Sequence, residues 1–200
     1  MRHMREGVPG AGVKMGNTSE PRPVRLLVGI IACDEKIIET AVPMMVEQWG
    51  PIDARSGTIP FDFTDYYEKE MGKGLLRQWV SFSRLISPAD LAGIKAGANN
   101  IECRLAVDGR RRINLDPGFV DSARLVLAST KDFSHRIYLS GGIYAEITMI
   151  YGKGHFRFLG WTYPDYRSDT ALNFFREIRN KYIADSAMSA EPLKHYEGDK

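Results

Sequence analysis

NLDPGFVDSARLVLASTKDFSHRIYLSGGIYAEITMIY, residues 114–151, is the stretch that decides the fold, because it contains the clearest strand pairing in the chain. Apolar and polar residues alternate on both sides of Ser140-Gly141-Gly142, with the two-residue period of a β-strand. A two-residue loop would mix the apolar and polar faces of the two strands. A three-residue loop keeps the apolar faces together and sets Arg136 opposite Glu146. The sequence therefore predicts a β-hairpin with a cross-strand ion pair.

The same register places Leu139 opposite Ile143 and Ile137 opposite Ala145. It also puts His135 on the apolar face of its strand. One interpretation is a packed, hydrogen-bonded core histidine. The other is a general acid or base, or a phosphate contact, because histidine titrates near neutral pH. The pattern leaves both interpretations open.

The segments that flank this hairpin extend the prediction. Before it, Arg112 to Leu115 reads as a short strand, and Asp116-Pro117-Gly118 as a turn into a helix. That helix would carry Val120, Ala123, Val126 and Leu127. After the hairpin, Gly152-Lys153-Gly154 predicts a second turn and His155 to Leu159 a third strand of a β-meander.

The first elements of the chain have strong local signals. Val24 to Ala32, VRLLVGIIA, is almost continuously apolar, which is typical of a strand buried on both faces. Asp34 is expected to cap a helix that ends at Gly50-Pro51. A second strand is expected at Ile52 to Phe61, interrupted near Ser56-Gly57.

The remaining elements complete the fold class. Leu75 to Ile86 reads as a third strand, and Ser87-Pro88-Ala89-Asp90 as the start of a helix that Asp108-Gly109 stops. Ser168 or Asp169 is expected to cap the last helix. The order β-α-β-β-α-β resembles a ferredoxin-like unit. We therefore predict a single α+β domain with a mixed sheet, in which a ferredoxin-like core is extended by a helix, a β-meander and a C-terminal helix.

Composition is that of a globular domain with two polar tails. The chain has 200 residues, 44% of them hydrophobic and 26% charged, which is the ordinary range for one soluble domain with a real core. We expect the domain to cover residues 23–185, with a disordered tail at 1–22 and a frayed tail at 186–200. The net charge of +2 is too small to indicate nucleic acid.

Targeting and redox signals point to the cytoplasm. No apolar run approaches the roughly 20 residues that span a bilayer, and the N-terminus lacks the order of a secretory signal. Cys33 and Cys103 are too few for a disulfide framework and lack the spacing of a metal site. A cytoplasmic protein with no membrane partner is the expectation.

Carboxylates supply the first candidates for chemistry. Asp62 and Asp65 follow a predicted strand, and Asp116 follows another. Such residues can hold Mg²⁺ or act as general bases, and they also serve as turn and cap residues. Asn114 would point to the same side as Asp116 if strand alternation holds. The two Gly-Lys-Gly runs, at 72–74 and 152–154, do not fit a phosphate-binding loop and read as turns.

Basic residues supply the second set. Lys131, Arg136 and Arg167 lie among aromatic and acidic residues, and a guanidinium suits carboxylate or phosphate recognition. The run Arg110 to Arg112 reads as a solvated face. The candidate pocket joins nine side chains: Asp62, Asp65, Tyr66, Asn114, Asp116, Lys131, His135, Arg136 and Arg167.

Five segments carry a resemblance to a known family. FDFTDYYEKEMGKGL at 61–75, INLDPGF at 113–119, TKDFSHRIYL at 130–139, GIYAE at 142–146 and WTYPDYRS at 161–168 closely resemble the DUF4416 family, prokaryotic proteins of unknown function. The resemblance runs from about Val24 to Tyr182 and implies no catalytic residues. Some such proteins carry a GTP-binding label. This chain has neither a Walker A loop nor a complete guanine motif, so the label is not adopted.

The leading hypothesis is a domain that binds a small anionic ligand, with a nucleotide or another phosphorylated molecule as candidates. If it is an enzyme, we expect hydrolysis or transfer at a phosphate ester. Asp116 with Asp62 or Asp65 would then hold Mg²⁺ or act as base, and Lys131 and Arg136 would balance developing charge.

The alternative hypothesis is a non-catalytic interaction module. Exposed aromatic residues such as Tyr163 and Tyr166 would then contact a protein partner. The two hypotheses differ in surface shape. A concave pocket lined by acids and bases favours ligand binding, and a flat aromatic patch favours the protein partner.

Overall fold

The computed structural model describes residues 18–187. Most of the two predicted tails, at 1–17 and 188–200, therefore lies outside the described residues. The elements in chain order are β1 (Val24–Ala32), α1 (Glu35–Trp49), β2 (Ile52–Arg55), β3 (Ile59–Pro60), α2 (Glu68–Met71), β4 (Leu76–Ile86), η1 (Pro88–Asp90), α3 (Leu91–Arg104), β5 (Ile113–Val120), β6 (Arg124–Ser129), β7 (Ile137–Ser140), β8 (Ile143–Gly152), β9 (His155–Phe158), η2 (Asp165–Arg167) and α4 (Asp169–Ala187).

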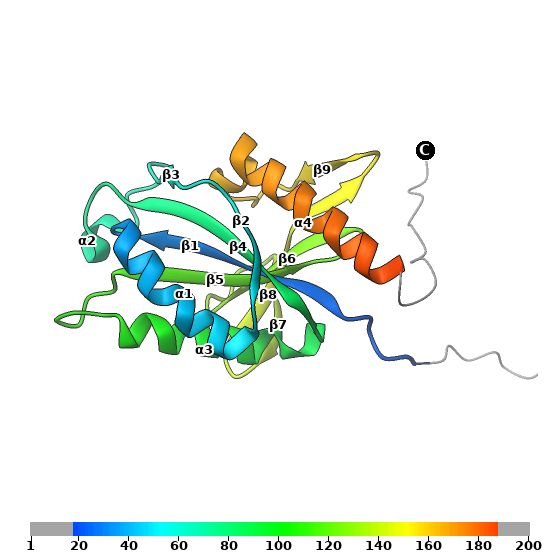
Figure 1. Cartoon of the computed structure of the whole chain (residues 1–200), viewed down its shortest axis with the longest axis horizontal. Helices are drawn as coiled ribbons and strands as arrows, with labels where there is room; N and C mark the ends of the chain where they lie inside the picture. The colour runs from blue at the N-terminus through cyan, green and yellow to red at the C-terminus, as the bar shows by residue number, and fades with distance from the viewer. Residues whose placement is uncertain (1–17, 188–200) are drawn as a thin grey trace, which may run out of the picture.

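One sheet runs through the domain in the order β2-β4-β1-β5-β6-β8-β7, with β3 paired to β4 and β9 paired to β8 (Figure 1). Every strand pair in the described residues is antiparallel, so the sheet is not mixed as predicted. The α+β class is confirmed. None of the helices in the described part of the chain is long and apolar enough to span a bilayer.

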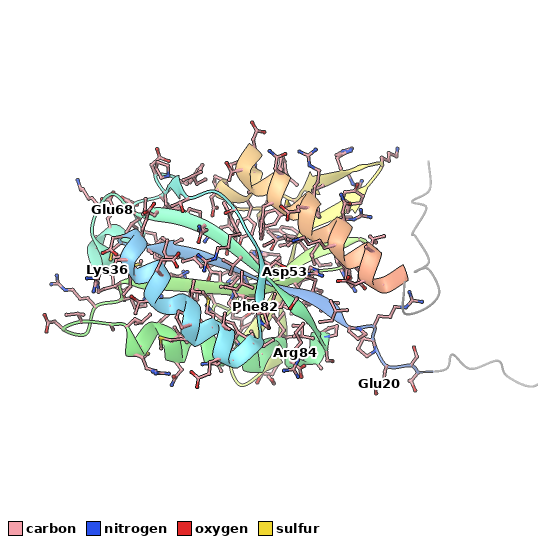
Figure 2. The ribbon with its side chains drawn as sticks, in the orientation of Figure 1. Glu20, Lys36, Asp53, Glu68, Phe82 and Arg84 are labelled. Atoms are coloured by element: carbon pink, nitrogen blue, oxygen red, sulfur yellow. The ribbon has the colours of Figure 1, made fainter. Side chains whose placement is uncertain are left out.

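Helices cover both faces of the central strands. Leu26, Val28 and Ile30 of β1 pack into a core with α1 and α3. On that side lies Phe82 of β4, which is labelled in Figure 2. Its ring meets that of Trp49 of α1 edge to face, with ring centroids 5.8 Å apart. The alternate residue Leu27 packs on the other face, against a core that includes residues of α4. All nine residues of β1 are buried, which confirms the prediction made from its continuous apolar run.

The predicted helix signals are confirmed at both starts. The Asp34 side chain accepts a hydrogen bond from the Ile37 amide at 2.8 Å, which caps α1. Gly50 ends that helix with φ at 92°. Ser87 and Asp90 form a capping box ahead of α3. The helix ends at Arg104, a few residues before the predicted stop.

The helix predicted after Asp116-Pro117-Gly118 is wrong, because this tripeptide lies inside β5. The turn comes later, where the Asp121 side chain accepts hydrogen bonds from the amides of Ala123 and Arg124, both at 2.8 Å. Residues 113–129 are therefore a β-hairpin, β5–β6. Gly118 is needed for close strand contact rather than for a turn, since a Cβ there would lie 2.2 Å from the carbonyl oxygen of Val126.

The predicted β7–β8 hairpin is confirmed, with a change at its end. Ile137 pairs with its predicted partner in β8. Ile143 pairs with Ser140 rather than Leu139, because Gly141-Gly142 form the turn with φ of 58° and 76° and the register shifts before Ser140. The first strand begins only at Ile137, so His135 precedes it.

Candidate functional site

A cavity opens where β5 and β6 separate. The two strands pair only through Gly118–Val120 and Leu125–Leu127, so the earlier part of β5 has no partner on that side. Pro117 suits this position, because it has no amide hydrogen to leave unpaired. The cavity, which we call the β5–β6 cavity, has a volume of about 710 Å³. Its wall comes from the loop before α2, from α3, from strands β1, β4, β5, β6 and β8, and from the loop around η2.

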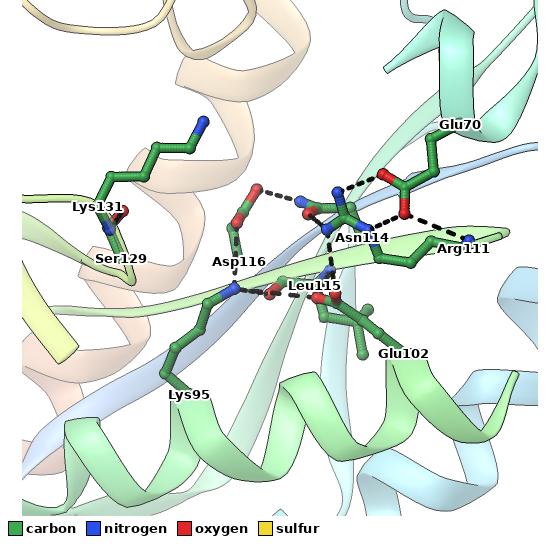
Figure 3. A network of polar contacts seen from close by, with 9 residues as sticks. All are labelled: Glu70, Lys95, Glu102, Arg111, Asn114, Leu115, Asp116, Ser129 and Lys131. Atoms are coloured by element: carbon green, nitrogen blue, oxygen red, sulfur yellow. Dashed lines mark hydrogen bonds and ion pairs between the residues drawn. The ribbon is translucent and has the colours of Figure 1, made fainter. Parts of the chain in front are cut away.

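Side chains of α3 take over the unpaired backbone of β5. The Leu115 amide donates to Glu102 Oε1 at 2.7 Å, and Lys95 Nζ donates to the Leu115 carbonyl at 2.7 Å (Figure 3). Both side chains are buried. Burial raises the pKa of Glu102 above its usual value, although Lys95 opposes the effect. The backbone amide and carbonyl of Leu115, which lack a strand partner on this side, are thus hydrogen-bonded by one buried acidic and one buried basic side chain.

A second network lies along the polar side of β5. Asn114 Nδ2 donates to Asp116 Oδ2 at 2.7 Å, and Arg111 Nη1 donates to Asn114 Oδ1 at 2.9 Å (Figure 3). Lys95 Nζ lies 3.5 Å from Asp116 Oδ1. Arg111 also binds Glu70 through two hydrogen bonds of 2.8 and 2.7 Å. Arg111 therefore does not belong to a solvated face, because folding surrounds it with oxygen acceptors.

The deepest part of the wall is built around Arg77, Asp165 and Tyr166, which we call the cavity floor. Arg77 Nε lies 2.8 Å from Asp165 Oδ2, and both side chains are buried. The guanidinium carbon stands 4.7 Å from the ring centroid of Trp79 and 5.0 Å from that of Tyr166. Burial raises the pKa of Asp165 and of Tyr166.

Gly29 in the middle of β1 makes room for this floor. A Cβ at Gly29 would lie 2.8 Å from the Tyr166 hydroxyl and 3.0 Å from Arg77 Nη2. The sequence prediction did not include Arg77, Asp165 or Tyr166 in the site. A glycine inside an apolar strand was the available signal, because it often marks a close approach of another group.

Glu146 forms the wall toward β8. Arg136 Nε donates to Glu146 Oε2 at 2.7 Å, which confirms the predicted pair. His135 Nε2 lies 3.1 Å from the same oxygen, and its ring stacks on Trp161 at 4.8 Å. His135 is thus hydrogen-bonded at the edge of the sheet and not on an apolar face. Arg136 Nη2 donates to the Tyr163 hydroxyl at 2.8 Å, while burial raises the pKa of Tyr163 to about 12.

Lys131 lies beside these buried pairs, because its carbonyl oxygen accepts a hydrogen bond from Arg136 Nη1 at 2.9 Å. Its ammonium nitrogen stands 4.1 Å from the ring centroid of Tyr66, a cation–π distance. Within residues 18–187, no carboxylate lies within ion-pair distance of Lys131. Figure 3 draws no contact to its ammonium group from any neighbouring side chain shown there.

The structure brings together part of the predicted pocket. Tyr66, Asn114, Asp116 and Lys131 line the β5–β6 cavity. Arg136 and His135 lie behind its wall and reach it through Glu146, with Arg136 also holding Tyr163.

Three predicted residues lie outside the cavity. Asp62 and Asp65 are exposed in the loop before α2, where the Asp65 carbonyl accepts from the Glu68 amide at 3.0 Å. Arg167 donates to the Thr162 carbonyl at 3.0 and 2.7 Å, so it holds the loop after β9. The described residues contain no group of three or more His, Cys, Asp or Glu side chains arranged to hold a metal ion.

The comparisons with known proteins identify a family and nothing more specific. The family model described as a domain of unknown function, DUF4416, matches residues 22–182. No curated protein and no solved structure matches the chain.

Proposed function

We propose that this chain, which belongs to the DUF4416 family, binds a small anionic ligand in the β5–β6 cavity. A nucleotide or another phosphorylated molecule is the class we favour. The observation that carries the proposal is the charge pattern of the wall, which leaves Lys131 as a cation without a carboxylate partner in the described residues.

The other charges of the wall are already matched. Asp165 pairs with Arg77, and Glu146 pairs with Arg136. Lys95 lies near both Glu102 and Asp116, and Arg111 also reaches Glu102. An anion can bind beside Lys131 without displacing a carboxylate, and the cavity wall there shields it in part from bulk water.

Size and aromatic content support a ligand that has a flat ring. A volume of about 710 Å³ lies within the usual range of roughly 300–1,000 Å³ for small-molecule sites. The wall includes the rings of Phe63, Tyr66, Tyr67 and Tyr163. Aromatic rings stack on nucleobases, each contributing about 1–3 kcal/mol. A nucleotide would place its phosphate at Lys131 and its base among these rings.

The test is a thermal-shift screen of nucleotides and sugar phosphates, with and without Mg²⁺. A ligand at a hundredfold excess over its dissociation constant stabilises the fold by about 2.7 kcal/mol. Lys131→Ala should abolish the shift. Lys36→Ala, an exposed lysine on α1, should keep it (Figure 2). Equal shifts in both variants would refute the site.

An enzymatic form of the proposal assigns hydrolysis or transfer at a phosphate ester to the same cavity. Asp116 would act as the base or hold Mg²⁺, because its carboxylate is 28% exposed and lines the cavity. Lys131 would balance developing charge. Asp62 and Asp65 do not line the cavity, so this form of the proposal assigns the role to Asp116 alone. Asp116→Asn should then remove turnover of a phosphate ester while ligand binding persists.

A second candidate function, a protein-interaction module, is supported by β7. All four residues of this edge strand are exposed, including Ile137 at 73% and Tyr138 at 58%. An exposed strand edge can pair with a strand of another protein. Tyr166 cannot serve there as predicted, since it is buried. Light scattering of the purified chain beside Ile137→Lys tests whether a second copy uses this edge.

Two finer features belong to the same proposal. We infer a ferredoxin-like unit from β1 to β5, which the strand order β2-β4-β1-β5 and the connecting helices α1 and α3 support. We also propose a cytoplasmic location. It is supported by Cys33 and Cys103, which are both free thiols.

A further inference from the structure

The cavity floor holds polar groups that the protein leaves unsatisfied. Arg77 Nη1 and the Tyr166 hydroxyl are buried, and neither donates a hydrogen bond to an acceptor among the described residues. Both residues line the β5–β6 cavity and are about 1% exposed. The Trp79 ring meets Tyr166 edge-on at 5.6 Å, and its indole N–H is directed at the Tyr166 hydroxyl oxygen, so the hydroxyl hydrogen still needs an acceptor. A buried donor left unpaired costs about 1–3 kcal/mol, so this arrangement calls for an explanation.

The floor is held rigidly in this unsatisfied state. Tyr166 stacks on Phe175 of α4 with ring centroids 5.3 Å apart, and Trp79 meets Phe175 at 5.8 Å. The guanidinium of Arg77 lies over the rings of Trp79 and Tyr166, within ion-pair distance of the Asp165 carboxylate. Donors fixed in advance by packing bind an acceptor without a further ordering cost.

The charge of the floor selects the kind of acceptor. Arg77 and Asp165 already neutralise each other, so a second buried anion would have no cation of its own. An uncharged carbonyl oxygen accepts hydrogen bonds without bringing a charge into the interior. Lys131 is exposed and Arg77 is buried, which places the anion site at the mouth and the acceptor site at depth.

We propose that Arg77 Nη1 and the Tyr166 hydroxyl bind a ring carbonyl oxygen of the ligand. This inference rests on the proposed anion site at Lys131 and adds a specificity. The ligand is a phosphorylated compound whose flat ring carries a carbonyl group, such as an oxopurine or oxopyrimidine nucleotide. An otherwise equal nucleotide with an amino group at that position leaves these donors unpaired and binds more weakly.

Inosine 5′-monophosphate and adenosine 5′-monophosphate are the matched probes, because they differ only at the six-membered ring, where inosine has a carbonyl oxygen and an N1–H in place of the amino group and bare N1 of adenosine. Calorimetry on the full chain should give at least a roughly tenfold lower Kd for the inosine nucleotide. Tyr166→Phe removes only the hydroxyl. It should bring the two Kd values within about threefold of each other, while the melting temperature of the free protein stays equal or rises, since an unsatisfied buried group is lost.

The outcomes separate this inference from the anion site. Lys131→Ala should weaken both nucleotides by the same factor, and failure to do so refutes the proposed function. If the wild-type protein binds both nucleotides with equal affinity and Lys131→Ala binds neither, only the carbonyl site is overturned. A Tyr166→Phe protein that melts several degrees lower and binds both nucleotides poorly also overturns it, because the hydroxyl is then structural. Binding of neither nucleotide to wild type rejects both proposals.

Discussion

Two glycines in the strands decide where the cavity can form. Gly118 lets β5 and β6 approach until a Cβ would meet the Val126 carbonyl oxygen at 2.2 Å. Immediately before it, β5 leaves β6 and the cavity begins. Gly29 lies beneath the floor, where a Cβ would meet the Tyr166 hydroxyl and Arg77. The absence of a side chain at Gly118 and Gly29 therefore sets how closely the neighbouring groups approach at both places.

Gly118→Ala should destabilise the fold by about 2 kcal/mol or more, because the neighbouring atom is backbone and cannot move aside cheaply. Gly93→Ala is the matched control. Gly93 is an exposed helical glycine with nothing within 4 Å of the added Cβ, so the change should stabilise by about 0.5–1 kcal/mol. Urea unfolding measures both. A Gly118→Ala protein as stable as wild type would show that the strands separate elsewhere.

The Glu70–Arg111 pair predicts a pH dependence of stability. Hydrogen bonds from Arg111 lower the pKa of Glu70 below its usual 4.5. A carboxyl with a lowered folded-state pKa stabilises above its unfolded pKa and loses this effect as the pH falls through the folded value. Glu70→Gln should cost about 0.5 kcal/mol at pH 7, a small value because the pair is partly exposed.

The deficit of Glu70→Gln should shrink as the pH is lowered below 4.5, since wild type then loses the same charge. Urea melts between pH 7 and pH 3.5 give the comparison. Glu68→Gln is the control, because Glu68 is exposed and forms no ion pair in the described residues (Figure 2). A deficit that stays constant with pH would assign the effect to packing.

At the scale of elements, short-range signals set where helices begin. Asp34 and Ser87 cap their helices as their positions in the sequence predict, because a cap needs only an oxygen and an amide two or three residues away. The turn predicted at Asp116-Pro117-Gly118 was wrong, because its outcome depends on a neighbouring strand and not on nearby residues. Proline and glycine are equally suited to a turn and to a strand edge that parts from its neighbour, and local sequence does not distinguish them.

Ser87→Ala should lower the free energy of unfolding by about 1 kcal/mol. The Ser87 hydroxyl accepts from the Ala89 amide, and the change removes one half of the capping box. Ser134→Ala, in the exposed loop before β7, should change stability by less than about 0.5 kcal/mol. Denaturant melts compare the two. Equal effects would mean that the cap contributes nothing to α3.

At the scale of the whole molecule, the sheet is protected at its centre and open at one end. β1 lies between β4 and β5 and is buried along its full length. β7 ends the strand order, and all of its residues are exposed. Backbone hydrogen bonds near a solvated edge open by local fluctuation, while those of a central strand open only with larger unfolding.

Hydrogen exchange followed by mass spectrometry should therefore show fast exchange in peptides covering Ile137–Ser140 and slow exchange in those covering Val24–Ala32. Peptides over Leu76–Ile86 serve as a second slow reference, since β4 pairs on both sides. Slow exchange at β7 would indicate that its edge is covered in solution. The interaction-module function would then gain support.

The sequence by itself determined the features that depend on near neighbours. The apolar run of β1, the helix caps and the Arg136–Glu146 pair across one hairpin were all predictable, because each rests on residue type and short spacing. It also marked Tyr66, Asn114, Asp116 and Lys131, which do line the cavity. Asp62, Asp65 and Arg167 looked equally suitable, because residue type alone does not distinguish a charged side chain in a pocket from one in a loop.

Only the tertiary structure decided the cavity itself. Its floor pairs Arg77 with Asp165, and its rim pairs Arg111 with Glu70, residues far apart in the chain. Such contacts depend on how the strands twist and separate, which is a property of the whole sheet and not of any short segment. For the same physical reason the buried donors of the floor became visible only after folding, since a group is unsatisfied only relative to everything packed around it.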